Sequence, residues 1–154
     1  MPGRFHRRLC AILLFAMLLP LPTAATEPVG PELTPRLHDL LRAEMQEVDT
    51  AMGRLFTALV TGEHARVAEQ ATRIHETFIL KQRLTAEDRR ALKRATPKAF
   101  RELDRTFHAR AAALAEAARA GDTERQWNRY RAMGQACITC HSRYATDRFP
   151  GLAR

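Results

Sequence analysis

Apolar side chains recur at steps of three and four residues along most of the chain beyond residue 34, and this spacing constrains the fold more than any other feature. Such steps bring side chains to one face of an α-helix, whereas a half-buried strand alternates with a period of two. The first group with this spacing consists of Leu37, Leu41, Met45, Val48, Met52, Leu55 and Leu59. No stretch of useful length alternates with a period of two, so the pattern predicts an all-α protein.

Start and stop signals divide this region into helices. Thr34 followed by Pro35 is typical of a helix N-terminus, and Thr85 with Asp88 three residues later has the form of a capping box. Asp122 is a further candidate for an N-cap. The signals predict helices over residues 35–61, 63–83, 85–96, 98–119 and 122–144. Because four of them are long and their links are short, we expect an antiparallel four-helix bundle.

The first 25 residues have the form of a secretory signal peptide. A basic start with three arginines precedes the apolar run Leu9–Leu19, and small residues end at Ala25. The run is shorter than the roughly 20 residues that span a bilayer, so we expect no stable membrane span after cleavage; a retained anchor is the alternative. Cys10 leaves with the signal, because the small residues that precede a lipoprotein cysteine are missing. The sequence therefore predicts export to the bacterial periplasm.

The remaining chain divides into three parts. Residues 26–34 contain prolines and a glycine without periodicity and predict a flexible lead-in, residues 35–145 form the helical domain, and residues 146–154 are expected to be an irregular tail. The net charge of +8 falls to +5 when the three arginines of the signal peptide are removed. The positive residues are scattered and only 6% of the residues are aromatic, so the composition does not favour nucleic-acid binding.

Cys137 and Cys140 are the only cysteines beyond the signal peptide, and His141 follows them directly. A Cys-x-x-Cys pair serves disulfide exchange, zinc binding or haem attachment. Disulfide exchange normally places the pair at the start of a helix after a strand, and a structural zinc site needs four ligands. Here the pair lies near the end of a long predicted helix, and no second cysteine pair exists. The pattern Cys-x-x-Cys-His indicates covalent attachment of haem c, and a disulfide or a free thiol pair remains the alternative.

The periodicity of the last predicted helix supports haem attachment. Residues at steps of three and four are Trp127, Tyr130, Gly134, Cys137, His141 and Tyr144. One helix face therefore carries the aromatic rings, the first thiol and the histidine, and we expect it to face the bundle. Cys137 and Cys140 would form thioethers with the two vinyl groups of the porphyrin, and His141 would supply the proximal nitrogen to the iron. Gly134 would allow a flat group to come close.

The eight residues from Cys137 to Tyr144, near the end of a helical chain with a signal peptide, resemble the motif of the cytochrome c′ family. The resemblance covers about residues 35–145 and includes the stretch Met52-Gly53-Arg54. It implies a four-helix bundle with one haem c per chain at one end, and homodimers that pair through the first two helices. Ala145 stands where the family motif ends with a basic residue near the proximal face of the haem. This departure counts against gas chemistry on the proximal side.

The resemblance also identifies a candidate for the sixth iron ligand. With Gly53 as the register, Met45 matches the distal residue of the family, and Met52 and His38 are weaker candidates. Most members leave this position vacant, with five-coordinate high-spin iron, whereas a smaller class fills it with methionine. A methionine opposite histidine raises the reduction potential and suits electron transfer. Packing in the core is the alternative role for Met45.

The sequence thus predicts a periplasmic c-type cytochrome that carries single electrons, with an unidentified redox partner protein and no enzymatic activity of its own. A five-coordinate protein that binds nitric oxide or carbon monoxide is the alternative. A haem-free thiol–disulfide protein is a less favoured alternative.

Overall fold

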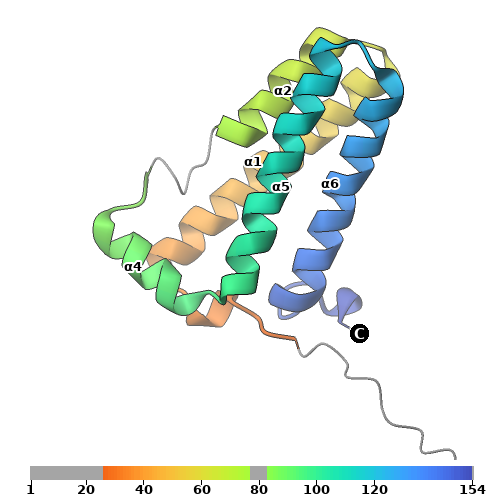
Figure 1. Cartoon of the computed structure of the whole chain (residues 1–154). Helices are drawn as coiled ribbons and strands as arrows, with labels where there is room; N and C mark the ends of the chain where they lie inside the picture. Colours follow the sequence, from red (N-terminus) through yellow and green to blue (C-terminus); the bar gives the residue numbers. More distant parts are fainter. Residues whose placement is uncertain (1–25, 77–82, 154) are drawn as a thin grey trace, which may run out of the picture.

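The structure is a computed structural model that describes residues 26–76 and 83–153. Four helices run alternately up and down as a bundle: α1 (Pro35–Val60), α2 (His64–Glu76), α5 (Lys98–Arg119) and α6 (Thr123–Tyr144). The short helix α4 (Ala86–Ala95) lies beside the end of the bundle where α1 and α5 begin (Figure 1). The described ranges contain two 3₁₀ turns, η1 (Gly30–Glu32) and η2 (Pro150–Leu152), and no strand. The prediction of an all-α bundle is confirmed.

The predicted capping residues begin three of the helices. The Thr34 hydroxyl accepts a hydrogen bond from the backbone N–H three residues on, at 3.3 Å. Thr85 and Asp88 form the reciprocal capping box of α4, with distances of 3.0 and 3.1 Å. The Asp122 carboxylate accepts from the N–H of Arg125 at 2.9 Å at the start of α6. These bonds satisfy backbone donors that have no partner within a helix. The predicted signal peptide and residues 77–82, within the second predicted helix, lie outside the described residues.

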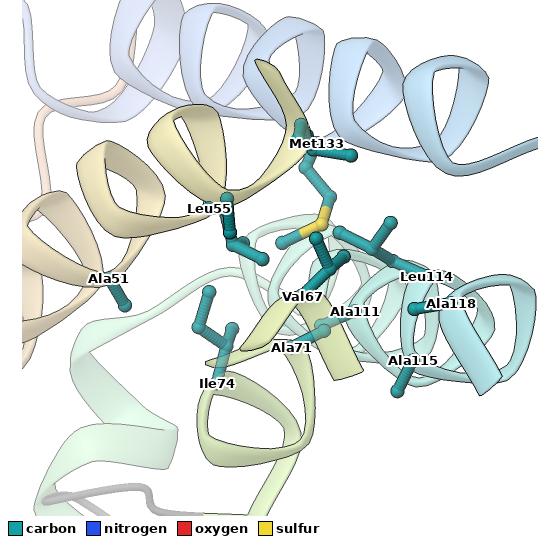
Figure 2. Packing of buried hydrophobic residues seen from close by; sticks show 12 residues of the cluster. Ala51, Leu55, Val67, Ala71, Ile74, Ala111, Leu114, Ala115, Ala118 and Met133 are labelled. Atoms are coloured by element: carbon teal, nitrogen blue, oxygen red, sulfur yellow. The ribbon is translucent and has the colours of Figure 1, made fainter. Parts of the chain in front are cut away.

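A small core joins the four helices of the bundle. Each contributes a large, fully buried side chain, namely Leu55, Val67, Leu114 and Met133. Figure 2 shows the Met133 side chain extending from α6 toward Val67 and Leu114. The other buried members of this core are Ala51, Ala58, Leu59, Ala71, Ile74, Ala111, Ala115 and Ala118. The alanines let the helices approach closely in the half of the bundle near the α1–α2 and α5–α6 turns.

Helices α1 and α6 form the smallest of the four interfaces around the bundle and diverge toward the opposite end (Figure 1). That end contains the C-terminal turns of α6 and the N-terminal half of α1. The core side chains described above lie away from it. The Cys-x-x-Cys-His motif is therefore positioned at the end of the bundle where α1 and α6 are least in contact.

The inward face of α1 is offset from the predicted apolar stripe. Leu40, Glu44 and Ala51 are buried, whereas the predicted Leu41, Val48 and Met52 are only partly buried. Met45 is 39% exposed, whereas its neighbour Glu44 is only 2% exposed. One residue along a helix is a rotation of about 100°, and Glu44 falls in line with the buried Leu37, Leu40 and Leu55. Met45 consequently lies to one side of the inward face.

The two terminal segments, predicted as a flexible lead-in and an irregular tail, make defined contacts with α6. The backbone N–H groups of Glu27 and Val29 donate to the carbonyls of Arg143 and Tyr144, at 2.8 and 3.0 Å. These carbonyls belong to the last turn of α6 and have no partner within the helix. Val29 is 4% exposed and the Arg143 guanidinium pairs with Glu27 at 3.2 Å. The lead-in thus closes the C-terminal end of α6.

In the part of the chain that the structure describes, no helix combines the length and hydropathy needed to cross a membrane.

Removal of the α6 N-cap should weaken the helix that carries the motif. We expect Asp122→Ala to lower the free energy of unfolding by about 1 kcal/mol, because the N–H of Arg125 loses its acceptor. Urea titration followed by circular dichroism measures this change. The neighbouring Thr123→Ala, which removes no capping bond, should have a much smaller effect. Equal losses from the two substitutions would contradict the assignment of Asp122 as the stabilising cap.

Candidate functional site

The last two turns of α6 carry both thiols and His141. Cys137 and Cys140 are partly buried and neither is in a disulfide. They are three residues apart in a continuous helix, so they lie on neighbouring turns of one side of α6. His141 is one turn beyond Cys137 and is also partly buried. The structure therefore brings together the three motif residues that the sequence predicts.

The surroundings of the two thiols keep them protonated. Burial raises the pKa of Cys137, and the negative charge of Asp49 on α1 raises it further. Burial, Asp104 on α5 and Cys137 together raise the pKa of Cys140 to about 11. Thiols that act in disulfide exchange have a lowered pKa, because the thiolate is the nucleophile. The environment of Cys137 and Cys140 thus argues against the thiol–disulfide alternative.

His141 presents a neutral imidazole at neutral pH. Burial lowers the pKa of its ring, since the charged form is poorly solvated at this position. A neutral imidazole nitrogen is the form that binds a metal ion. The chemistry of this side chain is consistent with an iron ligand.

A series of contacts between α1 and α6 defines the register of the two antiparallel helices. The Phe56 ring lies 6.1 Å from Trp127 and 6.4 Å from Tyr130, measured between ring centroids. About one turn earlier on α1, the Met52 carbonyl accepts a hydrogen bond from the Tyr130 hydroxyl at 3.3 Å. Further along α6, the negative charge of Asp49 on α1 raises the pKa of the first thiol, Cys137. Toward the end of the bundle where α1 and α6 diverge, residue numbers therefore decrease along α1 and increase along α6.

This register places Met45 at the level of His141. Met45 is one turn before Asp49 on α1, and His141 is one turn after Cys137 on α6. Met45 also shares a helix side with Phe56, eleven residues away, and Phe56 contacts α6. The exposed side chain of Met45 therefore belongs to the side of α1 that faces α6.

A buried polar cluster lies between α1 and α5 next to this site. Ligand atoms of Glu44, Asp104 and His108 lie within 4.8 Å of one another. The His108 Nδ1 atom is 2.9 Å from the Ile74 carbonyl oxygen, which leaves Nε2 to face Asp104 at 3.7 Å. The sequence analysis gave these three residues no role, since charged and polar residues on amphipathic helices are usually solvated. Asp104 and His108 are four residues apart on α5, but Glu44 is 60 residues from Asp104, so its part in the cluster leaves no local signal.

Two observations are consistent with a bulky group that has polar edges at this site. Nothing lies within 4 Å of the place that a Cβ atom would occupy at Gly134, one turn before Cys137. The Tyr144 hydroxyl is buried and has no hydrogen-bond partner among the described residues. A buried hydroxyl without a partner costs about 1–3 kcal/mol, so a polar group from outside the polypeptide would be favoured there. The free thiols, the neutral imidazole, the open face and this hydroxyl together fit a covalently attached haem.

The C-terminal tail contributes an aromatic ring that the sequence analysis missed. The Phe149 ring stacks on the His141 ring, with 4.8 Å between centroids and 19° between planes. Phe149 lies in the tail that was predicted to be irregular, and the tail has no other aromatic residue. The sequence signal for this contact was an isolated aromatic residue close to a metal-ligand motif.

Comparison with known families gives a match over most of the chain. The model of the family described as Cytochrome C' matches residues 38–145, a range that includes both Met45 and the Cys-x-x-Cys-His motif. Searches of curated proteins and of solved structures gave no match.

Proposed function

The chain belongs to the cytochrome c′ family, whose members bind one covalently attached haem c and serve in electron transfer or gas binding, and on this premise we propose that it is a periplasmic carrier of single electrons. The proposal assigns the two thioether bonds to Cys137 and Cys140, the proximal ligand to His141 and the distal ligand to Met45. When bound, the haem iron supplies the one-electron chemistry. The redox partner is an unidentified protein, and homodimer formation stays a prediction.

The antiparallel register of α1 and α6 is the observation that carries this proposal. It supports Met45 as the partner of His141, because Met45 is one turn before Asp49 on α1 and His141 is one turn after Cys137 on α6, so the same register carried on by one turn brings the two residues to a similar level. Glu44, the adjacent residue, instead clusters with Asp104 and His108 of α5. The buried Glu44 carboxylate is therefore directed toward α5, and the Met45 thioether is the group that can reach an iron bound on the α6 side.

The protein side chains would act by holding the iron in one coordination state. A preformed pair of ligands on two helices leaves little to rearrange when an electron arrives, and a thioether opposite an imidazole raises the reduction potential. The aromatic side chains of Phe56, Trp127 and Tyr130 pack on one another between α1 and α6, on the side of the motif nearer the core. The preformed ligand pair and the raised potential are properties of an electron carrier.

Replacement of Met45 tests the proposed distal ligand. We expect the purified ferric protein to have a low-spin visible spectrum, and Met45→Leu to convert it to a high-spin spectrum. The reduction potential should fall, because the thioether that favours ferrous iron is lost. Carbon monoxide should bind the reduced variant at least ten times faster than the parent, since no internal ligand has to leave.

Met52→Leu is the matched control, because Met52 lies on the same helix but at the level of Tyr130. It should keep the low-spin spectrum. A wild-type protein that is already high-spin, binds carbon monoxide rapidly and is unchanged by Met45→Leu would overturn the assignment and support the gas-binding alternative.

A further inference from the structure

The C-terminal tail folds back over the last turn of α6. The carbonyl of Ala145 accepts hydrogen bonds from the N–H groups of Arg148 and Phe149, at 3.1 and 2.9 Å. The second of these spans four residues and reverses the chain directly after the helix. Phe149 is thereby returned to the side of α6 that carries His141.

The lead-in supports this reversal from the other side. The Asp147 carboxylate lies so close to Gly30 that a Cβ atom there would come within 3.0 Å of Oδ2. Only glycine leaves this space without displacing Asp147. The backbone bonds from Glu27 and Val29 to the end of α6 place Gly30 beside the tail. Two segments from opposite ends of the described chain thus lie side by side at the turn that precedes Phe149.

The resulting stack restricts the His141 ring. The Phe149 and His141 rings are nearly parallel, at 19°, with centroids 4.8 Å apart. A flat ring in van der Waals contact with one imidazole face opposes rotation of the imidazole about its Cβ–Cγ bond and keeps water from that face. The guanidinium of Arg148 lies 5.8 Å from the Phe149 centroid and adds a cation–π contact on this ring. Phe149 is itself 38% exposed, so part of its ring contacts solvent while the ring covers one face of His141.

We propose that Phe149 is a positioning residue for the proximal ligand, which fixes the plane of the His141 imidazole and shields it from water. This inference rests on the proposed function in one respect, namely that His141 binds the haem iron. Groups around a metal-bound histidine set its orientation and its strength as a ligand. Phe149 performs this role by stacking, from a tail outside the bundle.

Electron paramagnetic resonance of the ferric holoprotein tests the proposal, because its g-values depend on the orientation of the axial imidazole. We expect Phe149→Leu, which keeps bulk but removes the flat ring, to shift or broaden the g-values. We also expect it to lower the reduction potential, since water near the ligand favours the ferric state. Phe149→Tyr, which keeps a flat ring, should retain both wild-type values. The readout is valid for either high-spin or low-spin iron, so it does not depend on Met45.

Leu152→Ala is the control for general packing of the tail, and it should leave the g-values and the potential unchanged. Haem content is measured first in every protein. Unchanged g-values and potential in Phe149→Leu at full haem content would overturn the role of Phe149 while leaving the proposed function intact. A wild-type protein without covalent haem would instead overturn the proposed function. Equal shifts in Phe149→Leu and Phe149→Tyr would also contradict stacking as the cause.

Discussion

Replacing both Cys137 and Cys140 by alanine should yield an exported chain without covalently attached haem. The two thiols are the only ones beyond the predicted signal peptide, so no other side chain can form a thioether with a vinyl group. Both are protonated at neutral pH because burial raises their pKa values, and they lie on adjacent turns of α6. Intact mass after denaturation should equal that of the polypeptide alone, and a haem stain of a denaturing gel should be negative.

The residues between the cysteines provide matched controls. Ile138 is 42% exposed, and Thr139 is also exposed. Ile138→Ala and Thr139→Ala should therefore keep the mass of one haem per chain when produced in cells that mature c-type cytochromes. Haem that remains on the double cysteine variant after denaturation would refute attachment through these thiols. A wild-type chain that never acquires haem in the same cells would refute the haem assignment itself.

The ends of the helices could be predicted from the sequence because their causes are local. Thr34, Thr85 and Asp122 each accept a hydrogen bond from a backbone group three residues away, so the relevant partners are visible in a short window. The same is true of the face that contains Cys137 and His141, because it depends only on the pitch of one helix. Local chemistry therefore predicted both the bundle and the grouping of the motif residues.

The orientation of α1 could not be predicted to within one residue. The apolar stripe of α1 is wide, and Glu44 and Met45 differ by one step of about 100°. The buried Glu44 carboxylate lies within 4.8 Å of ligand atoms of Asp104 and His108, so it is directed toward polar side chains of α5. An analysis of α1 alone treats a glutamate as exposed, and thus places Met45 deeper than it lies. The correct orientation depends on tertiary packing between helices that are distant in sequence.

The contacts of the terminal segments also involve partners that are distant in sequence. The bond between Glu27 and Arg143 joins residues 116 positions apart. Residues 26–34 contain prolines and a glycine and have no periodicity, which indicates that they form no long helix. These features do not indicate that the segment packs against the end of α6. Phe149 and His141 are close in sequence, but their rings stack only because the chain turns at Ala145. No proline or glycine indicates this turn.

Leu114→Ala should cause the largest loss of stability among single substitutions in the core. Leu114 is 0% exposed and packs in the cluster to which α1, α2, α5 and α6 all contribute (Figure 2). Truncation of a buried leucine costs about 2–5 kcal/mol through lost burial and the cavity that remains. Six of the twelve buried members of this cluster are alanines, which have no side-chain freedom to fill the space, and the flexible Met133 can move partly into it. We therefore expect a loss of about 3 kcal/mol in the free energy of unfolding.

Urea denaturation of the holoprotein, followed by far-ultraviolet circular dichroism, measures this loss as a lower midpoint with an unchanged slope. Val60→Ala is the control, because Val60 is 56% exposed at the end of α1 and its truncation should change stability by no more than about 0.5 kcal/mol. Leu114 lies in the half of the bundle away from His141, so the visible spectrum of the folded variant should match that of the parent. A loss below about 1 kcal/mol would show that the alanine-rich core closes around the cavity, contrary to the packing described here. A changed spectrum would show instead that the core and the haem end are coupled, in which case the position of α1 relative to α6 depends on Leu114.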